Sequence, residues 1–122
     1  MRAEPAVADV DSDLLRRVLE NLVDNACKYT PAGGAISLEV APHEGRVDLS
    51  VSDEGPGIPE HARDRIFDKY AQLEDRRHVH GRGLGLTFCK LAVEAHGGRI
   101  WVAENHPHGS RFCIALVGGE AA

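Results

Sequence analysis

Residues 20–30 read Glu-Asn-Leu-Val-Asp-Asn-Ala-Cys-Lys-Tyr-Thr and form the second half of a predicted helix. At 3.6 residues per turn, Asn21, Asn25 and Lys28 share one polar face of this helix. The opposite, apolar face consists of Leu15, Val18, Leu19, Leu22 and Ala26, and it is expected to pack in a core. Two carboxamides and an ammonium, with carboxylates beside them, could hold a divalent cation and phosphates. An ordinary solvated helix face is the alternative.

Length and composition are those of one globular domain. The chain has 122 residues, 43% hydrophobic and 27% charged, so we expect a single domain over residues 1–122, with a leader at 1–8 and a tail at 118–122. The formal charge of -5 argues against a nucleic-acid binder. No apolar run reaches the ~18 residues of a membrane span, and no signal-peptide pattern opens the chain. The sequence therefore predicts a cytoplasmic domain without membrane contact.

The three cysteines, Cys27, Cys89 and Cys113, are widely separated and odd in number. This spacing favours neither a disulfide framework nor a CxxC metal site. Each cysteine stands among apolar neighbours, so all three are expected to be small buried hydrophobes.

The first half of the chain predicts a helix followed by a hairpin. An N-cap within residues 11–13 begins the helix, and Thr30-Pro31 ends it, because the residue before proline is pushed out of the helical region. The preceding residues are a leader or a marginal strand around residues 6–10. Alternating apolar positions then predict two strands, one at Ile36, Leu38 and Val40 and one at Val47, Leu49 and Val51, joined by residues 42–45.

The second half predicts a helix between loops, followed by another hairpin. Residues 54–59 hold two glycines and two prolines and must be a tight loop, and residues 60–70 give a short helical piece. A polar loop at 71–80 leads into a helix that stops at Gly97-Gly98, and strands follow at 100–102 and 112–116. The fold class is α+β: a two-layer α/β sandwich with a mixed, mostly antiparallel sheet and helices on one face.

Two further segments could meet a ligand at the polar helix face. Asp53 follows a strand and precedes Gly55 and Gly57, so its carboxylate stands beside a backbone that a flat group could approach closely; a simple turn cap is the alternative. The glycine-rich residues 81–85 open a helix, where exposed N–H groups bind phosphate. Their spacing is neither the dinucleotide fingerprint nor a P-loop.

Together these segments resemble the ATP-binding domain of sensor histidine kinases, in the Bergerat-fold (GHKL) group that also includes type II topoisomerases and certain chaperones. Residues 21–30 look like the asparagine box of that family, and residues 53–58 look like its first glycine box. Residues 66–70 match its phenylalanine box and residues 81–86 its second glycine box. The resemblance covers roughly residues 9–117, and four boxes in the family's order make it specific.

The resemblance implies ATP and Mg²⁺ as cofactors and assigns roles to particular residues. Asn25 would ligate Mg²⁺, and Asp53 would accept a hydrogen bond from the adenine amino group. The catalytic positions would be Glu20, Asn21 and Lys28. The ATP-binding positions would be Asn21, Asn25, Lys28, Tyr29, Asp53, Gly55, Gly57, Ile58, Phe67, Arg76, Arg77, Gly81, Arg82, Gly83, Leu84, Gly85 and Leu86. Residues 71–80 would be a lid that ATP orders. Arg82 stands where the family more often has a small residue, so either phosphate contact or solvent exposure stays open for it.

The implied function is the ATP-binding catalytic domain of a two-component sensor histidine kinase, a protein kinase that donates the γ-phosphoryl of ATP to a histidine. The acceptor and dimerisation helices are not in this sequence, so the expected partners are a separate histidine-bearing domain and a response regulator. An anti-sigma-type serine kinase of the same fold and a non-catalytic adaptor that docks a response regulator are the alternatives. Topoisomerase or chaperone function is disfavoured, because the second glycine box has the kinase form.

Overall fold

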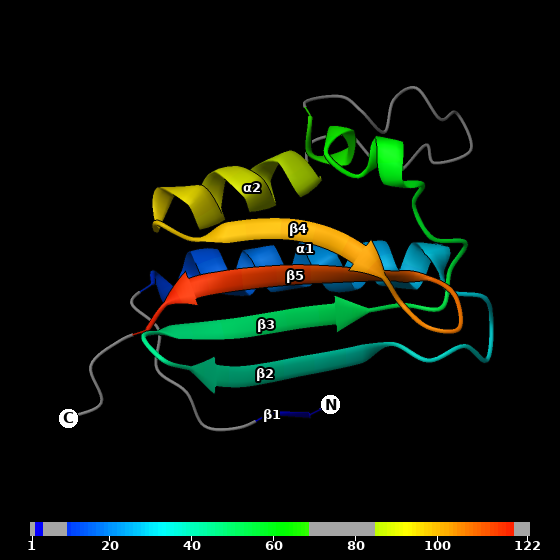
Figure 1. Cartoon of the computed structure of the whole chain (residues 1–122), viewed down its shortest axis with the longest axis horizontal. Helices are drawn as coiled ribbons and strands as arrows, with labels where there is room; N and C mark the ends of the chain where they lie inside the picture. The colour runs from blue at the N-terminus through cyan, green and yellow to red at the C-terminus, as the bar shows by residue number, and fades with distance from the viewer. Residues whose placement is uncertain (1, 4–9, 69–84, 119–122) are drawn as a thin grey trace.

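The computed structural model describes residues 2–3, 10–68 and 85–118, and it has two main helices against one sheet (Figure 1). The elements in chain order are β1 (Arg2–Ala3), α1 (Ser12–Tyr29), β2 (Ser37–His43), β3 (Arg46–Ser52), the 3-10 turns η1 (Glu60–Ala62) and η2 (Arg65–Phe67), α2 (Gly85–Ala95), β4 (Arg99–Glu104) and β5 (Ser110–Val117).

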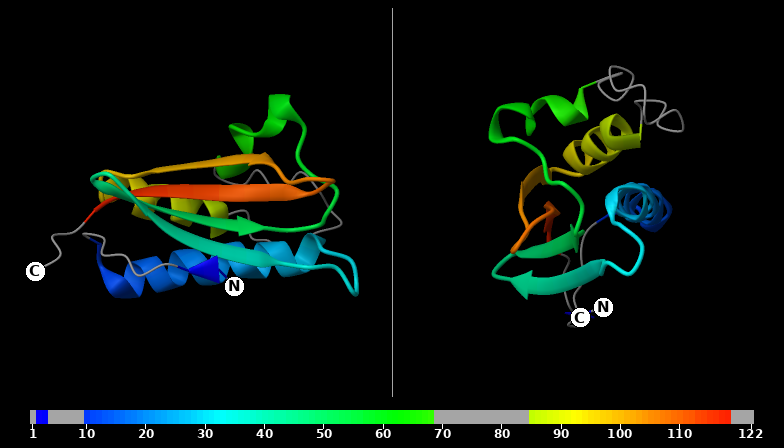
Figure 2. Two further views of the ribbon diagram at one scale, coloured as in Figure 1. Left: turned by 60° about the horizontal axis from the view of Figure 1, so that its bottom comes forward. Right: turned by 90° about the vertical axis from the view of Figure 1, so that its right-hand side faces the viewer.

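The five strands form one sheet in the order β1-β2-β3-β5-β4. Among the described residues, the β1–β2 pair is parallel and the other three pairs are antiparallel. Figure 2 shows that α1 and α2 lie on the same face of the sheet. The predicted two-layer sandwich with a mixed, mostly antiparallel sheet is therefore confirmed.

The core fills the space between the two helices and the sheet. Strand residues alternate between the two faces, so β3 and β5 each send every second side chain toward the helices. The buried core residues from the sheet are Val47, Leu49, Val51, Val102, Phe112, Ile114 and Leu116, and those from the helices are Val18, Leu22, Ala26, Leu86, Cys89, Ala92 and Val93. The apolar stripe predicted for α1 thus supplies its buried face.

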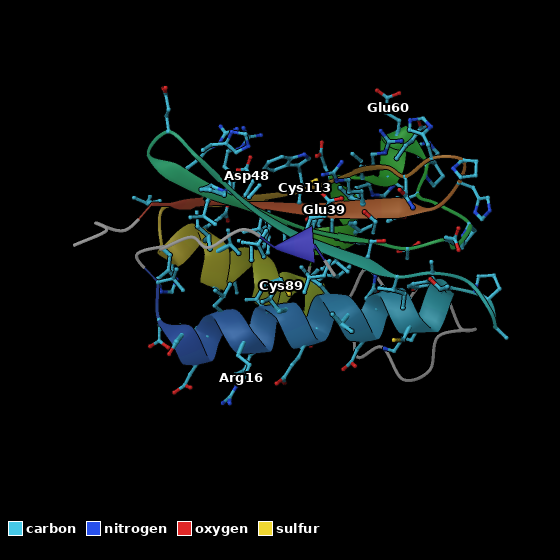
Figure 3. All side chains as sticks on the ribbon, turned by 90° about the horizontal axis from the view of Figure 1, so that it is seen from below. Arg16, Glu39, Asp48, Glu60, Cys89 and Cys113 are labelled. Atoms are coloured by element: carbon cyan, nitrogen blue, oxygen red, sulfur yellow. The ribbon has the colours of Figure 1, made fainter. Side chains whose placement is uncertain are left out.

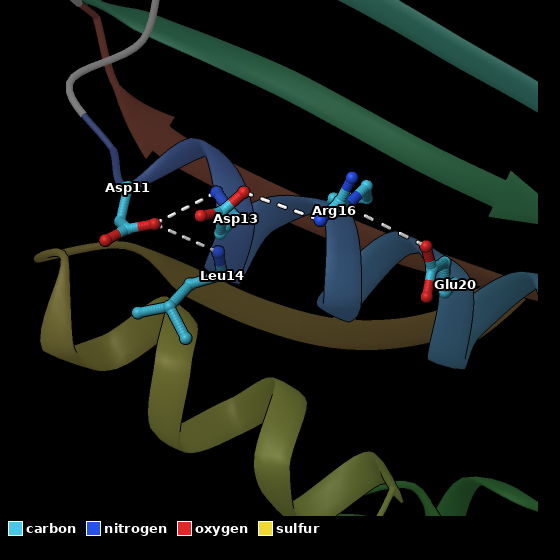
Figure 4. A network of polar contacts seen from close by, with 5 residues as sticks. All are labelled: Asp11, Asp13, Leu14, Arg16 and Glu20. Atoms are coloured by element: carbon cyan, nitrogen blue, oxygen red, sulfur yellow. Dashed lines mark hydrogen bonds and ion pairs between the residues drawn. The ribbon is translucent and has the colours of Figure 1, made fainter.

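Helix α1 begins where the sequence predicts. The side chain of Asp11 accepts hydrogen bonds from the backbone N–H of Asp13 at 2.9 Å and of Leu14 at 3.1 Å (Figure 4). Its own N–H donates to Nε2 of His96 at 3.1 Å, and Nδ1 of His96 lies 2.7 Å from the carbonyl oxygen of Ala92. Since His96 follows α2, this contact joins the start of one helix to the end of the other.

Helix α2 ends in a glycine cap, as predicted. Gly97 has φ +74°, and its N–H donates to the carbonyl oxygen of Glu94, while the N–H of Gly98 donates to that of Val93. These are the two bonds of a Schellman motif, and its left-handed position favours glycine. The turn delivers the chain directly into β4.

The described N-terminal strand is Arg2–Ala3, and the predicted leader or marginal strand around residues 6–10 falls almost entirely on residues 4–9, which lie outside the described residues. Three other local predictions are wrong. The pairing of β2 with β3 stops at Ser37, which lies opposite Ser52. Ile36 therefore lies outside the strand, where it is 37% exposed. Strand β2 also includes Pro42 and His43, so Glu44 and Gly45 alone form the turn to β3. Proline has no N–H to donate, and its absence is tolerated near the edge of a sheet. Residues 60–68 contain two separate 3-10 turns instead of one helical piece, and residues 69–70 lie outside the described residues.

The cysteines differ from one another in environment. Cys89 is buried between the layers, and burial raises the pKa of its thiol to about 12, so it stays protonated at neutral pH (Figure 3). Cys113 is half-buried on the sheet face away from the helices, where burial also raises its pKa. Cys27 is exposed, contrary to prediction, because it is one residue and about 100° around α1 from the buried Ala26.

No helix among the described residues combines the length and apolar character that a membrane crossing requires.

Candidate functional site

Three predicted site segments meet at the C-terminal end of α1. Figure 1 shows the end of α1, the end of β3 and the start of α2 at the same side of the molecule. A Cβ added to Gly85, the first residue of α2, would lie 3.5 Å from Oδ1 of Asn21. A Cβ added to Gly55 would lie 2.8 Å from the carbonyl oxygen of Tyr29. The polar helix face, the loop after Asp53 and the N-terminus of α2 are therefore direct neighbours.

Asp53 is held firmly in this site. Its side chain is almost completely buried, and Oδ1 accepts hydrogen bonds from the N–H of Gly55 at 2.9 Å and of Ser110 at 3.1 Å. Its own N–H donates to the carbonyl oxygen of Ser110 at 2.9 Å. Both side-chain bonds thus use a single oxygen of the carboxylate, and β5 fixes the position from which the carboxylate projects.

The loop after Asp53 also depends on glycine where the chain comes close to itself. Gly57 has φ +80°, and a Cβ there would lie 3.3 Å from the carbonyl oxygen of Gly109. Gly109, with φ +111°, lies so near the peptide of Asp53 that an added Cβ would stand 1.9 Å from its carbonyl oxygen. This packing leaves no room for a side chain at Gly109.

The side chains on the polar face of α1 differ in exposure. Asn25 is buried at 7% relative exposure, Asn21 is half-buried and Lys28 is exposed. Within the described part of the chain, no hydrogen bond reaches the carboxamide of Asn25. Buried carboxamides normally have partners, so an unpaired one that keeps contact with solvent is suited to an added ligand.

Glu20 projects about 100° around the helix from Asn21. It is 65% exposed, and its Oε1 lies 3.9 Å from Nε of Arg16. The structure therefore does not bring Glu20 to the face that carries Asn21 and Asn25, and its catalytic role stays a prediction.

Some predicted site residues support the site from the core side. Phe67 and Leu86 are each 5% exposed, and the Phe67 ring stands edge-on to Phe112, with centroids 6.2 Å apart. The Thr87 hydroxyl donates to the Phe67 carbonyl oxygen at 3.0 Å, which joins the first turn of α2 to η2. Ile58 is partly buried against the same core. Their predicted contact with nucleotide remains a prediction.

The remaining predicted positions lie outside the described residues. They are Arg76, Arg77, Gly81, Arg82, Gly83 and Leu84, together with the rest of the expected lid at 71–80.

Residues that the sequence analysis did not single out also shape the site. The Asn105 side-chain Nδ2 donates to the carbonyl oxygen of Asp53 at 2.8 Å. The N–H of Glu54 donates to the Thr30 hydroxyl at 3.3 Å, and the Glu54 carboxylate accepts from the N–H of Ala35. Glu54 thereby links the loop after β3 to the segment after α1. A hydrogen-bonding side chain between two strands is too common a feature to have signalled Asn105.

One family model matches most of the chain. The model described as "Histidine kinase-, DNA gyrase B-, and HSP90-like ATPase" aligns with residues 10–118. Among similar sequences, the adaptive-response sensory kinase SasA of a Synechococcus strain is 46% identical over 108 residues, which are 88% of this chain and 29% of that protein. SasA of a Nostoc strain is 46% identical over 103 residues, which are 84% of this chain and 25% of that protein. The chain thus spans less than a third of these relatives.

Solved structures agree with these sequence matches. Full-length ShkA in complex with AMPPNP has a TM-score of 0.82 at 32% identity, covering 99% of this chain and 26% of that one. The mycobacterial sensor histidine kinase MprB has a TM-score of 0.80 at 32% identity, covering 98% and 83%. The catalytic domain of the histidine kinase ThkA, in a nucleotide-free form, has a TM-score of 0.79 at 32% identity, covering 91% and 71%.

Proposed function

Because the chain belongs to the family of histidine kinase-, DNA gyrase B- and HSP90-like ATPases, we propose that it is the ATP-binding catalytic domain of a sensor histidine kinase. The observation that carries this proposal is the meeting of Asn21, Tyr29 and Asp53 with the start of α2 at one end of the molecule. A nucleotide with its cation needs neighbouring groups that bind the base, the cation and the phosphates.

The Asp53 end would hold the adenine base. A carboxylate accepts hydrogen bonds and cannot donate them when ionised, so it selects a base edge that carries an amino group. Oδ1 of Asp53 is already engaged with two backbone N–H groups, which leaves Oδ2 as the acceptor for the base. The loop that contains Gly55 and Gly57 would lie beside the ring, with Tyr29 next to Gly55.

The α1 end would hold Mg²⁺ and the phosphates. Mg²⁺ prefers oxygen ligands and is commonly shared between one protein group and the phosphates of a nucleotide. The unpaired, nearly buried carboxamide of Asn25 fits this role, and the bound cation would neutralise phosphate charge. Lys28 would add a positive charge, and Asn21 would face phosphate oxygens beside the N-terminus of α2.

The reaction would be transfer of the γ-phosphoryl group to an imidazole nitrogen, with ADP as the leaving group. Phosphoryl transfer requires positioning and charge neutralisation more than a protein nucleophile, and Asn21, Asn25 and Lys28 would contribute to both. The acceptor histidine would stand on a dimerisation domain in the part of the protein that this chain does not span, and a response regulator would then take the phosphoryl group. The domain would act on the cytoplasmic side.

A direct test is incubation of the chain with γ-labelled ATP, Mg²⁺ and a histidine-bearing helical fragment from a similar kinase. We expect label on the fragment that is lost in acid, as phosphohistidine is, and no label when its histidine is replaced. Asn25→Ala is the matched control within the chain and should reduce transfer. Acid-stable label would support a serine kinase instead, and nucleotide binding without transfer to any acceptor would support an adaptor.

A further inference from the structure

The peptide of Asp53 is surrounded by hydrogen bonds from the β4–β5 loop. Asn105 begins that loop, and its side-chain Nδ2 donates to the Asp53 carbonyl oxygen at 2.8 Å. The backbone N–H of Asn105 donates to the carbonyl oxygen of Gly109 at 3.1 Å, which closes the loop on itself. The next residue, Ser110, accepts a hydrogen bond from the backbone N–H of Asp53, and its own N–H donates to the Asp53 side-chain Oδ1. Asn105 is thus the one side chain of this loop, among the described residues, that bonds directly to the backbone of Asp53.

The bond from Asn105 comes where the strand ladder ends. The last pair between β3 and β5 is Ser52 with Arg111, so the carbonyl of Asp53 lies beyond the ladder. A carbonyl oxygen only accepts, so the atom that faces it must be the Asn105 amide nitrogen. This side-chain donor takes the place of the strand N–H that would otherwise hold the peptide of Asp53 in plane.

The loop has fewer contacts on its outer side. A cavity of about 470 Å³ is lined by residues within 56–63 and 104–109, including Asn105. Two longer contacts connect its sides: Arg63 and Glu104 form an ion pair at 3.8 Å, with Glu104 largely exposed, and Nδ1 of His108 lies 3.4 Å from the carbonyl oxygen of Gly55. If the shorter Asn105 bond is lost, the peptide of Asp53 keeps its bonds to Ser110 but loses the restraint on its carbonyl group, so the direction of the carboxylate can change.

We propose that Asn105 is a positioning residue for base selectivity: its bond to the Asp53 carbonyl oxygen sets the direction of the Asp53 carboxylate and so the preference for a purine with an amino group. The proposal rests on the proposed function, because it assumes that Asp53 receives the base. Asn105 itself would not touch the nucleotide.

Calorimetry with ADP and with inosine diphosphate tests this role. Inosine diphosphate carries a carbonyl oxygen where ADP carries the amino group, and a protonated N1 where ADP carries an acceptor, so the ratio of the two affinities reports on hydrogen bonding to this edge of the base. We expect the parent chain to prefer ADP, and Asn105→Ala to lower that ratio about tenfold, as expected for a misdirected charge-assisted hydrogen bond. A purely structural defect would reduce the folded fraction and weaken both nucleotides equally, which leaves the ratio unchanged.

His106→Ala is the matched control, because His106 is the exposed next residue of the same loop. It should keep the parental ratio. If Asn105→Ala does not fold, Asn105→Ser is measured instead, and the same outcomes decide. An unchanged ratio in the Asn105 variant overturns the positioning role.

Asp53→Asn, measured in the same series, separates this proposal from the proposed function. If Asp53→Asn weakens ADP while the Asn105 variant keeps the parental ratio, only the role of Asn105 is overturned. If the parent chain does not distinguish ADP from inosine diphosphate, or if Asp53→Asn binds ADP like the parent, the base site itself is wrong. A lowered ratio in both variants supports both statements.

Discussion

The two ends of the candidate site are built differently. At the Asp53 end, the peptide N–H, the peptide carbonyl and one carboxylate oxygen are all engaged by the loop and strand around Ser110. At the α1 end, the carboxamide of Asn25 is nearly buried and has no hydrogen bond among the described residues. The Asp53 end, which is the proposed base end, is therefore shaped before any ligand arrives, whereas the α1 end, which is the proposed cation end, has an unpaired carboxamide on a helix. Substitutions at the two ends should accordingly differ in their effect on stability and on binding.

The largest effect on stability is expected from Gly109→Ala, a substitution at the Asp53 end. An added Cβ would stand 1.9 Å from the Asp53 carbonyl oxygen, at a φ of +111° that alanine rarely adopts. Overpacking and backbone strain together should cost about 3–5 kcal/mol of unfolding free energy in chemical denaturation. Gly45→Ala is the control: its φ is +70°, but nothing lies within 4 Å, so only about 1 kcal/mol is expected. Equal costs at both positions would show that the Asp53 end is not tightly built.

Asp53→Asn should reduce affinity more than stability. Both backbone N–H bonds to the side chain go to Oδ1, and asparagine keeps that oxygen. The second oxygen becomes an amino group that faces the adenine amino group, donor against donor. Calorimetry with ADP should show a loss of about ten- to a hundredfold, the range for one charge-assisted hydrogen bond of about 1.5–3 kcal/mol. ADP binding equal to that of the parent would remove Asp53 from the base pocket.

Asn25→Ala should show the opposite balance at the cation end. Because no hydrogen bond to this carboxamide exists among the described residues, its loss should change unfolding free energy by less than about 1 kcal/mol. The gain in ATP affinity on adding Mg²⁺ should fall about tenfold, since one oxygen ligand is lost. Cys27→Ala, two residues along the helix and exposed, is the control and should keep the full Mg²⁺ effect. An undiminished Mg²⁺ effect in Asn25→Ala would end the metal role.

The sequence predicted the parts of the fold that depend on local pattern. The apolar stripe of α1, the stop at Thr30 and the glycine cap after α2 all follow from spacing and backbone preference, and all three are present. The extent of β2 was wrong because Pro42 and His43 are tolerated through cross-strand pairing with Val47 and Arg46, which no local pattern reveals. The exposure of Cys27 follows from its place about 100° around α1 from the buried Ala26, which its apolar neighbours in sequence do not reveal.

The sequence indicated candidate ligand-binding residues better than the residues that hold them in position. Asn25 and Asp53 were singled out because their neighbours in sequence, a helix face and a pair of glycines, carry the signal, and the structure brings both to the candidate site. Asn105 was missed because its role depends on a contact across 52 positions of sequence, which only the folded β4–β5 loop creates. Glu20 is adjacent to Asn21 in sequence, but one residue is about 100° on a helix, so the two side chains project from different faces, and the catalytic role of Glu20 stays a prediction.

The smallest effect is expected from Asp11→Ala, at the end of α1 remote from both parts of the site. The substitution removes the acceptor for the N–H groups of Asp13 and Leu14 but keeps the backbone bond from Asp11 to His96. Losing such a cap should cost about 1 kcal/mol of unfolding free energy, and Asp11→Asn, which can still accept, should recover most of it. Since the 18-residue helix places Asp11 about 27 Å from Tyr29, neither end of the site should feel the change directly. A loss of 1 kcal/mol also leaves nearly all of a chain with ordinary stability folded, so ADP affinity by calorimetry should stay within about twofold of the parent. A fall in affinity that matches the loss of stability would mean that the site depends on α1 as a whole, and the contrast between a preformed base end and an open cation end would then not be local.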